Sequence, residues 1–330
     1  MSSDDGGQTP YMDLAGLEQD AAPGPTPPPG TRSSTEPPSG ARNRRTGTVV
    51  LAGLAAAVAV IVVFSPASGG SNASVARAVD DTNTQEQVDN GAAERAVAAL
   101  PVTSEALAAL PQATTKGTVP NAPQDPAPAL HTGGRIVHPS VTVPVYAAPG
   151  GQAIAALPPQ QHFDGAVSDT SVPIIAEKPG WAQVLLPTRP NHSTGWIHLD
   201  DPAITTLHSP VRISVDRERF QLTLFRDDAA IGRWTIGVGK SSAVTPAGRT
   251  FVLGSILEEH PTYSPVILPL GAHSDTHMSF GGGPGTVGIH TWPSADVFGR
   301  AASDGCVRVP RDALDEIART APLGSVVEIS

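Results

Sequence analysis

The residues best suited to chemistry lie close together near the C-terminus. Cys306, the single cysteine of the chain, follows Ser303, Asp304 and Gly305 in "SDGCVR", and His290 precedes this stretch in "GIHTWP". A cysteine nucleophile needs a base that takes the thiol proton, an exposed turn, and backbone N–H groups that face the developing oxyanion. These residue types predict covalent catalysis with Cys306 as nucleophile and His290 as base. The alternative is a buried cysteine and an unrelated surface histidine.

A β-rich domain is predicted around these residues, from residue 210 to residue 330. Apolar and polar residues alternate in "VRISVDRERFQLTLFRDD", "AIGRWTIGVG", "RTFVLGSI" and "GSVVEI", which is typical of strands. One helix is predicted in "PRDALDEIART", where Pro310 lies near the start and Ala313, Leu314 and Ile317 form one apolar face. The predicted fold is therefore mainly β with one main helix.

These segments, in this order, resemble the L,D-transpeptidase (YkuD-type) catalytic domain family across residues 211–330. The resemblance includes a Thr-Pro-x-Gly turn, here Thr245 to Gly248. It also includes the family signature of a histidine followed, after a gap, by Ser-His-Gly-Cys and then x-Arg or x-Asn. The resemblance implies that His290 is the base and Cys306 the nucleophile. Asp304 stands where the family commonly has a second histidine.

Further site residues are implied by the same resemblance. Gly305 and Asp304 belong to the turn on the oxyanion side of the nucleophile. A carboxylate two residues before a thiolate disfavours the thiolate by like-charge repulsion, so we expect Arg308 to pair with Asp304. The resemblance implies no metal and no cofactor. The supporting or substrate-binding residues that it implies are Ser303, Arg308, Thr291, Met278 and Phe280.

Members of this family form or exchange cross-links in bacterial peptidoglycan. The resemblance implies that Cys306 attacks a tetrapeptide stem at the L-centre carbonyl of its third residue, releases the terminal D-alanine and forms a thioester. The side-chain amine of a neighbouring diamino acid then resolves the thioester into a 3→3 cross-link, whereas resolution by water makes the enzyme an L,D-carboxypeptidase. Carbapenem-type β-lactams are the expected inhibitors.

A zinc site and a non-catalytic role are the alternatives to this function. His273 and His277 have a spacing that can serve zinc, but the glycines on both sides do not assure one shared helical face. A non-catalytic peptidoglycan-binding wall protein is a second alternative, with Asp304 marking a degenerate site; the intact nucleophile and base argue against it. Nucleic acid is not an expected partner, because residues 211–330 hold 11 Lys and Arg against 13 Asp and Glu, without a basic stripe.

Residues 139–202 predict a separate, small all-β domain. Short alternating stretches, among them "VTVPVYAAPG" and "PGWAQVLLP", are separated by Pro, Gly and Asn turns. Trp181 in "PGWAQV" and Trp196 in "TGWI" resemble the tryptophans of bacterial SH3-like domains. The resemblance implies a small SH3-like β-barrel that binds the cell wall or acts as a spacer. Both tryptophans are equally well explained as core residues.

The N-terminal part differs in composition from both domains. The chain holds 34 prolines and 33 glycines, and residues 1–47 are predicted to form a disordered cytoplasmic tail. Residues 48–64 are apolar, uncharged and preceded by arginines, which predicts a single-pass membrane anchor with its N-terminus inside. A cleaved signal peptide is the alternative. Residues 65–138, rich in Ala and Pro, predict a stalk that holds an extracytoplasmic catalytic domain near the wall.

Overall fold

The computed structural model describes residues 95–279 and 283–330. The predicted tail of residues 1–47 and the predicted anchor of residues 48–64 lie outside the described residues, as does the stalk up to residue 94. Within the described part of the chain, no helix is long and apolar enough to cross a membrane.

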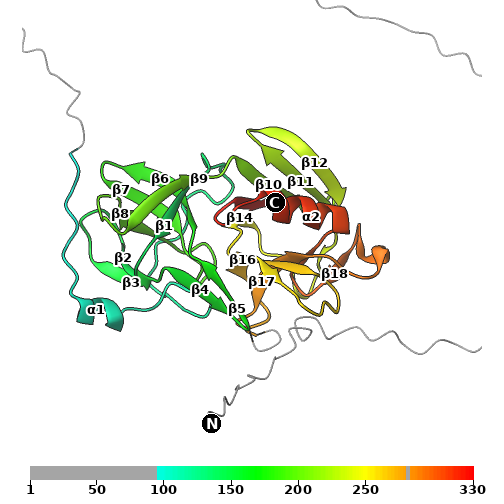
Figure 1. Cartoon of the computed structure of the whole chain (residues 1–330), viewed down its shortest axis with the longest axis horizontal. Helices are drawn as coiled ribbons and strands as arrows, with labels where there is room; N and C mark the ends of the chain where they lie inside the picture. The colour runs from blue at the N-terminus through cyan, green and yellow to red at the C-terminus, as the bar shows by residue number, and fades with distance from the viewer. Residues whose placement is uncertain (1–94, 280–282) are drawn as a thin grey trace, which may run out of the picture. The chain divides into compact units, whose positions relative to one another are not determined.

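The first part of the described chain forms a seven-stranded sheet (Figure 1). The order across this sheet is β3-β2-β8-β7-β6-β1-β9, and β4 and β5 form a separate hairpin. The strands are β1 (Arg135–Pro139), β2 (Val143–Tyr146), β3 (Ala153–Leu157), β4 (Gln160–Phe163), β5 (Ala166–Asp169), β6 (Val172–Lys178), β7 (Trp181–Leu185), β8 (Thr194–His198) and β9 (Ile204–His208).

The apolar positions of these strands meet in one core. The predicted alternation does not extend to β7, whose five residues are all buried, whereas β6 is buried at its start and exposed at its end. The sheet extends beyond the predicted limits of residues 139–202, because β1 pairs antiparallel with β9 along its whole length. The core residues include Val137, Val145, Ala155, Val184 and Ile197.

Trp181 is a core residue of this first β domain. Its side chain is fully buried, and its Nε1 atom donates a hydrogen bond to the carbonyl oxygen of Val97 at 2.7 Å. Its ring packs edge-on against the rings of Tyr146 and His198. These contacts support the core interpretation of Trp181. The assignment of the domain to the SH3-like class stays a prediction.

Part of the predicted stalk packs against the first β domain. Helix α1 (Ser104–Ala109) precedes a segment that forms β-bridges from Gln112 to Ala156 and from Thr118 to Arg189. Ala113, Val119 and Ala122 are buried in the same core as the sheet. The stalk assignment is therefore wrong for this segment, whose scattered small apolar residues lack the alternation that marks a strand.

The second part contains a five-stranded sheet and a four-stranded sheet (Figure 1). The five-stranded sheet has the order β12-β11-β10-β20-β14, and the four-stranded sheet has the order β15-β16-β17-β19. A short parallel pair, β13 and β18, completes the strands. The bounds are β10 (Val211–Asp216), β11 (Gln221–Arg226), β12 (Ala229–Thr235), β13 (Val238–Gly239), β14 (Gly248–Phe251), β15 (Ile256–Leu257), β16 (Val266–His273), β17 (Thr286–His290), η2 (Ala295–Val297), β18 (Ala301–Ser303), β19 (Val307–Arg308), α2 (Arg311–Thr320) and β20 (Val326–Ile329).

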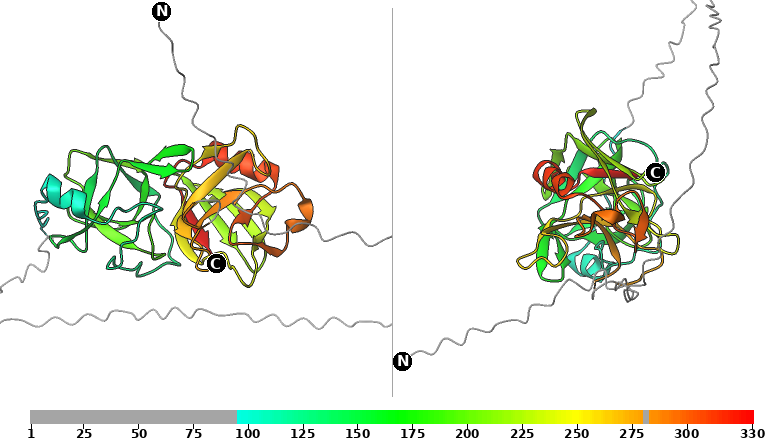
Figure 2. Two further views of the ribbon diagram at one scale, coloured as in Figure 1. Left: turned by 90° about the horizontal axis from the view of Figure 1, so that it is seen from below. Right: turned by 90° about the vertical axis from the view of Figure 1, so that its right-hand side faces the viewer.

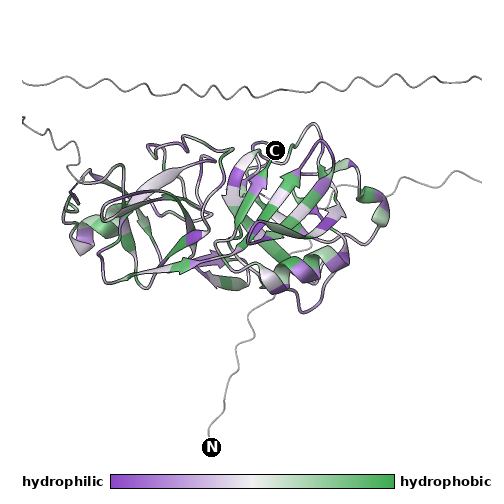
Figure 3. Ribbon diagram, turned by 90° about the horizontal axis from the view of Figure 1, so that it is seen from above, coloured by the Kyte–Doolittle hydropathy of each residue, from purple (hydrophilic) through white to green (hydrophobic). Residues whose placement is uncertain are grey.

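The predicted elements of this part are confirmed. The hairpin is β10 paired antiparallel with β11, and the last strand β20 runs parallel to β10. Helix α2 buries the predicted face of Ala313, Leu314 and Ile317 and contacts β12 and β16 (Figures 1 and 2). Buried and partly exposed positions alternate along β10, whereas β16 and β17 are buried over most of their length. Figure 3 shows hydrophobic residues on these strands, and together with the apolar face of α2 they form one core.

Candidate active site

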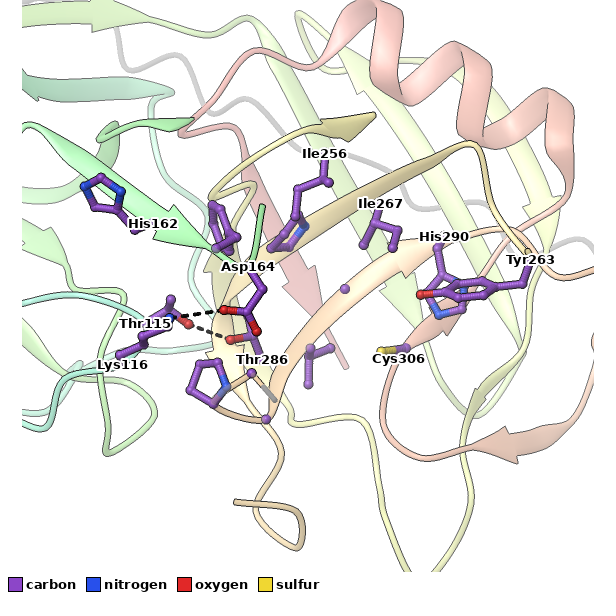
Figure 4. Close-up of a pocket in the computed structure, with 17 residues that line it drawn as sticks. Thr115, Lys116, His162, Asp164, Ile256, Tyr263, Ile267, Thr286, His290 and Cys306 are labelled. Carbon is purple, nitrogen blue, oxygen red and sulfur yellow. Dashed lines mark hydrogen bonds and ion pairs between the residues drawn. The ribbon is translucent and has the colours of Figure 1, made fainter. Parts of the chain in front are cut away.

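Two neighbouring parallel strands bring the predicted base and nucleophile together. Strand β17 ends at His290, and Cys306 directly precedes β19. The pairing of these strands aligns Ile289 with Val307 and His290 with Arg308. Both His290 and Cys306 line one pocket, where Figure 4 shows the thiol and the imidazole side by side. The structure thus joins two residues that are distant in sequence.

A backbone carbonyl sets the tautomer of His290. The Nδ1 atom lies 2.7 Å from the carbonyl oxygen of Thr291. Since a carbonyl oxygen only accepts hydrogen bonds, Nδ1 carries the proton, and Nε2 is the basic nitrogen of the neutral ring. The ring of Tyr263 packs edge-on against the imidazole at 5.1 Å between centroids. His290 is thus a buried and fixed side chain suited to accept a proton through Nε2.

Ser303 holds the turn that presents Cys306. Its hydroxyl donates to the carbonyl oxygen of Cys306 at 2.6 Å and accepts from the N–H of Gly305 at 3.2 Å. Gly305 has a φ of 121°, a backbone conformation that side-chain-bearing residues rarely adopt. Because its N–H is engaged by Ser303, we assign Gly305 to the turn rather than to the oxyanion. The hydroxyl of Ser303 thus links the backbone on both sides of the turn, which is how it would support Cys306.

The carboxylate of Asp304 is paired differently from the prediction. It lies 2.7 Å from the ammonium group of Lys240 and 3.6 Å from Nε2 of His277. The predicted partner, Arg308, places its guanidinium over the ring of Trp292 at 3.8 Å from the centroid. The prediction of the Asp304 partner was wrong, because the nearest cation in sequence is not the one that the fold brings beside the turn.

The strand pair β13 and β18 explains why Lys240 is the partner. The pairing aligns Val238 with Ala301 and Gly239 with Ser303. Directly after β13, the N–H of Lys240 donates to the carbonyl oxygen of Ser303 at 2.8 Å. The backbone of Lys240 is therefore fixed beside the Cys306 turn, and its side chain meets Asp304.

The remaining predicted residues are Thr291, Met278 and Phe280, and the structure supports a role near the site only for Thr291. The buried Thr291 donates its N–H to the hydroxyl of Ser264 at 3.0 Å, which orders the chain just after His290. Met278 is 68% exposed and does not line the pocket. Phe280 lies outside the described residues.

His273 has a structural environment. Its Nε2 atom lies 2.7 Å from the carbonyl oxygen of Thr115, and its Nδ1 atom is buried without a hydrogen-bond partner among the described residues. Burial lowers the pKa of His273 to about 4, from an ordinary value of 6.5. No group of three or more potential metal ligands occurs within residues 95–279 and 283–330.

The first β domain supplies one wall of the pocket, which the sequence analysis did not anticipate. Strands β15, β16 and β17 supply the apolar side chains of Ile256, Ile267 and Val287. The opposite end from Cys306 is lined by residues of the first domain (Figure 4). These residues are Thr115, Lys116, His162, Phe163 and Asp164.

A family model now identifies the domain that carries this site. Residues 210–329 match the model of the L,D-transpeptidase catalytic domain, YkuD. His290 and Cys306 both fall in this range, so the site lies within an L,D-transpeptidase catalytic domain. The resemblance inferred from the sequence is confirmed for this part of the chain.

Solved structures of three L,D-transpeptidases are similar to parts of the chain. The catalytic domain of the Enterococcus faecium enzyme has 21% identity and a TM-score of 0.29, and the match covers 36% of this chain and 96% of that chain. The Mycobacterium smegmatis enzyme has 14% identity and a TM-score of 0.31, with coverages of 48% and 99%. L,D-transpeptidase 3 of Mycobacterium tuberculosis, solved with a faropenem-derived adduct, has 12% identity and a TM-score of 0.31, with coverages of 52% and 76%. No curated protein matches the chain.

Proposed function

We propose that this protein is a cysteine L,D-transpeptidase that forms 3→3 cross-links between peptidoglycan stem peptides. The observation that carries the proposal is the placement of Cys306 beside His290, whose Nδ1 is tied to a carbonyl and whose Nε2 is therefore basic. A thiol beside a basic imidazole in an accessible pocket is suited to acyl transfer. The match of residues 210–329 to the catalytic domain model supports the same reaction class.

In the acylation step, Nε2 of His290 takes the proton of the Cys306 thiol. The thiolate attacks the carbonyl carbon at the L-centre of the third stem residue and forms a C–S bond. The C–N bond to the terminal D-alanine then breaks, and the imidazolium returns its proton to the leaving amine. The product is a thioester on Cys306 and free D-alanine.

In the second step, the side-chain amine of a diamino acid on a neighbouring stem attacks the thioester. A C–N bond forms, the C–S bond breaks, and His290 takes a proton from the amine and returns it to the thiolate. The enzyme regains its starting state and the two stems are joined. If water attacks instead, the same site acts as an L,D-carboxypeptidase.

Lys240 and Asp304 act on the charge around the nucleophile. A carboxylate near a thiolate opposes the negative charge on sulfur, whereas a cation nearby favours it. The Asp304 carboxylate is paired with Lys240 at 2.7 Å, so most of its charge is compensated. We assign to this pair the role of shaping the turn without a large penalty for the thiolate.

The location of the protein is also a proposal. Peptidoglycan lies outside the cytoplasmic membrane, and the apolar, uncharged residues 48–64 follow several arginines. We therefore propose a single-pass anchor with an extracytoplasmic catalytic domain. In wall-stripped cells, added protease is expected to digest the chain after residue 64 and to spare the first 45 residues. A mature N-terminus near Ser68 contradicts the anchor and indicates a cleaved signal.

The function is tested by incubating the protein with disaccharide tetrapeptides and separating the products by mass spectrometry. A cross-linked dimer together with released D-alanine supports the transpeptidase. D-alanine and tripeptide without a dimer indicate the carboxypeptidase. Binding to the wall fragments without any covalent product indicates a non-catalytic wall protein, and Cys306→Ala serves as the inactive control.

A further inference from the structure

We propose that the first β domain forms a substrate subsite of the catalytic pocket, in which Lys116 and Asp164 bind a zwitterionic side-chain end. The ligand class is a side chain whose terminal carbon bears both an ammonium and a carboxylate group. The inference rests on the proposed function and selects, among the diamino acids of stem peptides, those whose side chain carries such an end. It adds a recognition element from outside the matched catalytic domain.

The pocket is continuous from the nucleophile to this pair. Cys306 and His290 line one end, and Lys116 and Asp164 line the other (Figure 4). The Nζ atom of Lys116 lies 3.4 Å from Oδ1 of Asp164, and the two side chains are 52% and 34% exposed. A substrate bound at Cys306 therefore has a route to one cation and one anion that are close together.

The surface between the two ends is apolar. Ile256, Ile267 and Val287 line it from the catalytic domain, and Phe163 lines it from the first β domain. Such a surface suits the methylene groups of an aliphatic side chain, whereas a charged end needs polar partners. The pocket thus has the pattern expected for an aliphatic chain that ends in charged groups.

A buried network fixes the segment that carries Lys116. The hydroxyl of Thr115 lies 2.5 Å from the hydroxyl of Thr286 and 3.2 Å from Nε2 of His273, and its N–H donates to Oε1 of Gln161 at 3.3 Å. Thr115, His273 and Gln161 are buried. Thr286 begins β17, the strand that ends at His290. The Lys116 backbone is therefore held in register with the strand that carries the base.

A tight turn presents Asp164. It lies between β4 and β5, and the following residue, Gly165, has a φ of 76°. The β4 and β5 register pairs Phe163 with Ala166, so the loop has two residues and projects the carboxylate at its tip. Gln161 of β4 is part of the Thr115 network. Both charges of the pair are thus presented by ordered backbone.

The ion pair itself can open at little cost. Partly exposed ion pairs contribute little to stability, because water screens the charges and long side chains lose entropy when they pair. A zwitterionic ligand offers a carboxylate to Lys116 and an ammonium group to Asp164. The ligand carboxylate then replaces that of Asp164 beside Lys116, and the ligand ammonium group replaces that of Lys116 beside Asp164. A ligand with only one of these charges leaves one member of the pair without a new partner.

The test compares two tetrapeptide donors that differ only at the third residue. One carries a diamino acid whose side chain ends in a carbon with both ammonium and carboxylate, and the other carries lysine, which lacks the carboxylate. We expect Lys116→Ala to lower kcat/KM for D-alanine release from the first donor about tenfold. For the lysine donor, we expect the same substitution to change kcat/KM less than about twofold. We expect Asp164→Ala to lower kcat/KM about tenfold for both donors, mainly by raising KM.

A matched ion pair serves as the control. Arg135 and Glu177 form a similarly exposed ion pair in the same β domain and do not line the pocket. Arg135→Ala and Glu177→Ala are expected to leave kcat/KM unchanged for both donors. Equal losses for the two donors in Lys116→Ala, or losses of the same size in the control variants, overturn the subsite. Absence of D-alanine release from both donors by the wild-type chain instead contradicts the proposed function, and the subsite with it.

Discussion

The carboxylate of Asp304 lies 2.7 Å from the ammonium group of Lys240. Asp304 lies two residues before Cys306, and Lys240 lies directly after β13, so the pair joins the turn of the predicted nucleophile to the loop after β13. Asp304 is only 12% exposed at its side chain, so its charge is poorly screened by water. The Lys240 ammonium group is therefore placed to compensate the charge of this carboxylate near Cys306.

Removal of Lys240 is expected to make the nucleophile less reactive at neutral pH. In Lys240→Met, the Asp304 carboxylate loses its nearer partner and keeps His277 at 3.6 Å, and we expect the pH midpoint of carbapenem acylation to rise by about 0.5 to 1 unit. The measurement is the acylation rate against pH by intact mass. Asp304→Asn is the matched control and should move the midpoint down or leave it in place. A midpoint that is equal in Lys240→Met and the wild type contradicts this role.

Loss of the Ser303 hydroxyl is expected to disturb the turn. Ser303→Ala leaves the Gly305 N–H and the Cys306 carbonyl without this partner in a buried place, which costs about 1 to 3 kcal/mol of unfolding free energy. We also expect slower acylation, because Cys306 is less well fixed. Denaturant unfolding and the acylation rate check both effects. The exposed Ser140, which donates to Ala203 O, provides the control, and an equal loss in Ser140→Ala argues against the turn role.

The buried His273 is expected to make stability depend on pH. Its pKa of about 4 in the folded state lies below the ordinary value of 6.5. The unfolded chain therefore binds more protons between these two values, and the free energy of unfolding falls as the pH drops through this window, by about 3 kcal/mol in total. His273→Gln should flatten this dependence in denaturant titrations between pH 4 and 7. The exposed His208→Gln should keep the slope, and an unchanged slope in His273→Gln counts against the assignment.

A buried ion pair connects the segment that had been predicted as a stalk to strand β14 in the second part of the chain. Arg249 of β14 donates through Nε and Nη2 to the two carboxylate oxygens of Asp125, both at 2.7 Å. Asp125→Ala leaves a buried guanidinium without its counter-ion and should cost about 3 to 5 kcal/mol of unfolding free energy. Asp315→Ala, which breaks an exposed pair with Arg311 on α2, should have little effect. Similar unfolding midpoints for the two variants are the contradictory outcome.

Local patterns predicted the elements of the catalytic domain well. The hairpin of β10 and β11 and the buried face of α2 depend on side-chain alternation and helical spacing, which are visible within a few residues. The His290 and Cys306 pair was predicted from residue types and from the family signature. The partner of Asp304 was not, because Lys240 reaches it through a strand pairing between distant segments.

The contribution of the first β domain to the pocket had no local signal. Lys116 lies in a segment that composition alone assigns to a stalk, and Asp164 lies in a hairpin that was not predicted. Their place in the pocket that Cys306 also lines follows from contacts such as Thr115 with Thr286, which join residues far apart in the sequence. A polar contact of this kind leaves no periodicity, so only the three-dimensional structure shows it.

The most direct test of the proposed function is the covalent modification of Cys306 by a carbapenem, followed by intact-mass spectrometry. The wild-type chain is expected to gain one adduct, because His290 generates the thiolate that attacks the β-lactam carbonyl. Cys306→Ala should gain none, and His290→Ala should gain it at a rate lower by about a hundredfold or more. An adduct of equal mass on the wild type and on Cys306→Ala contradicts the assignment of Cys306 as the nucleophile.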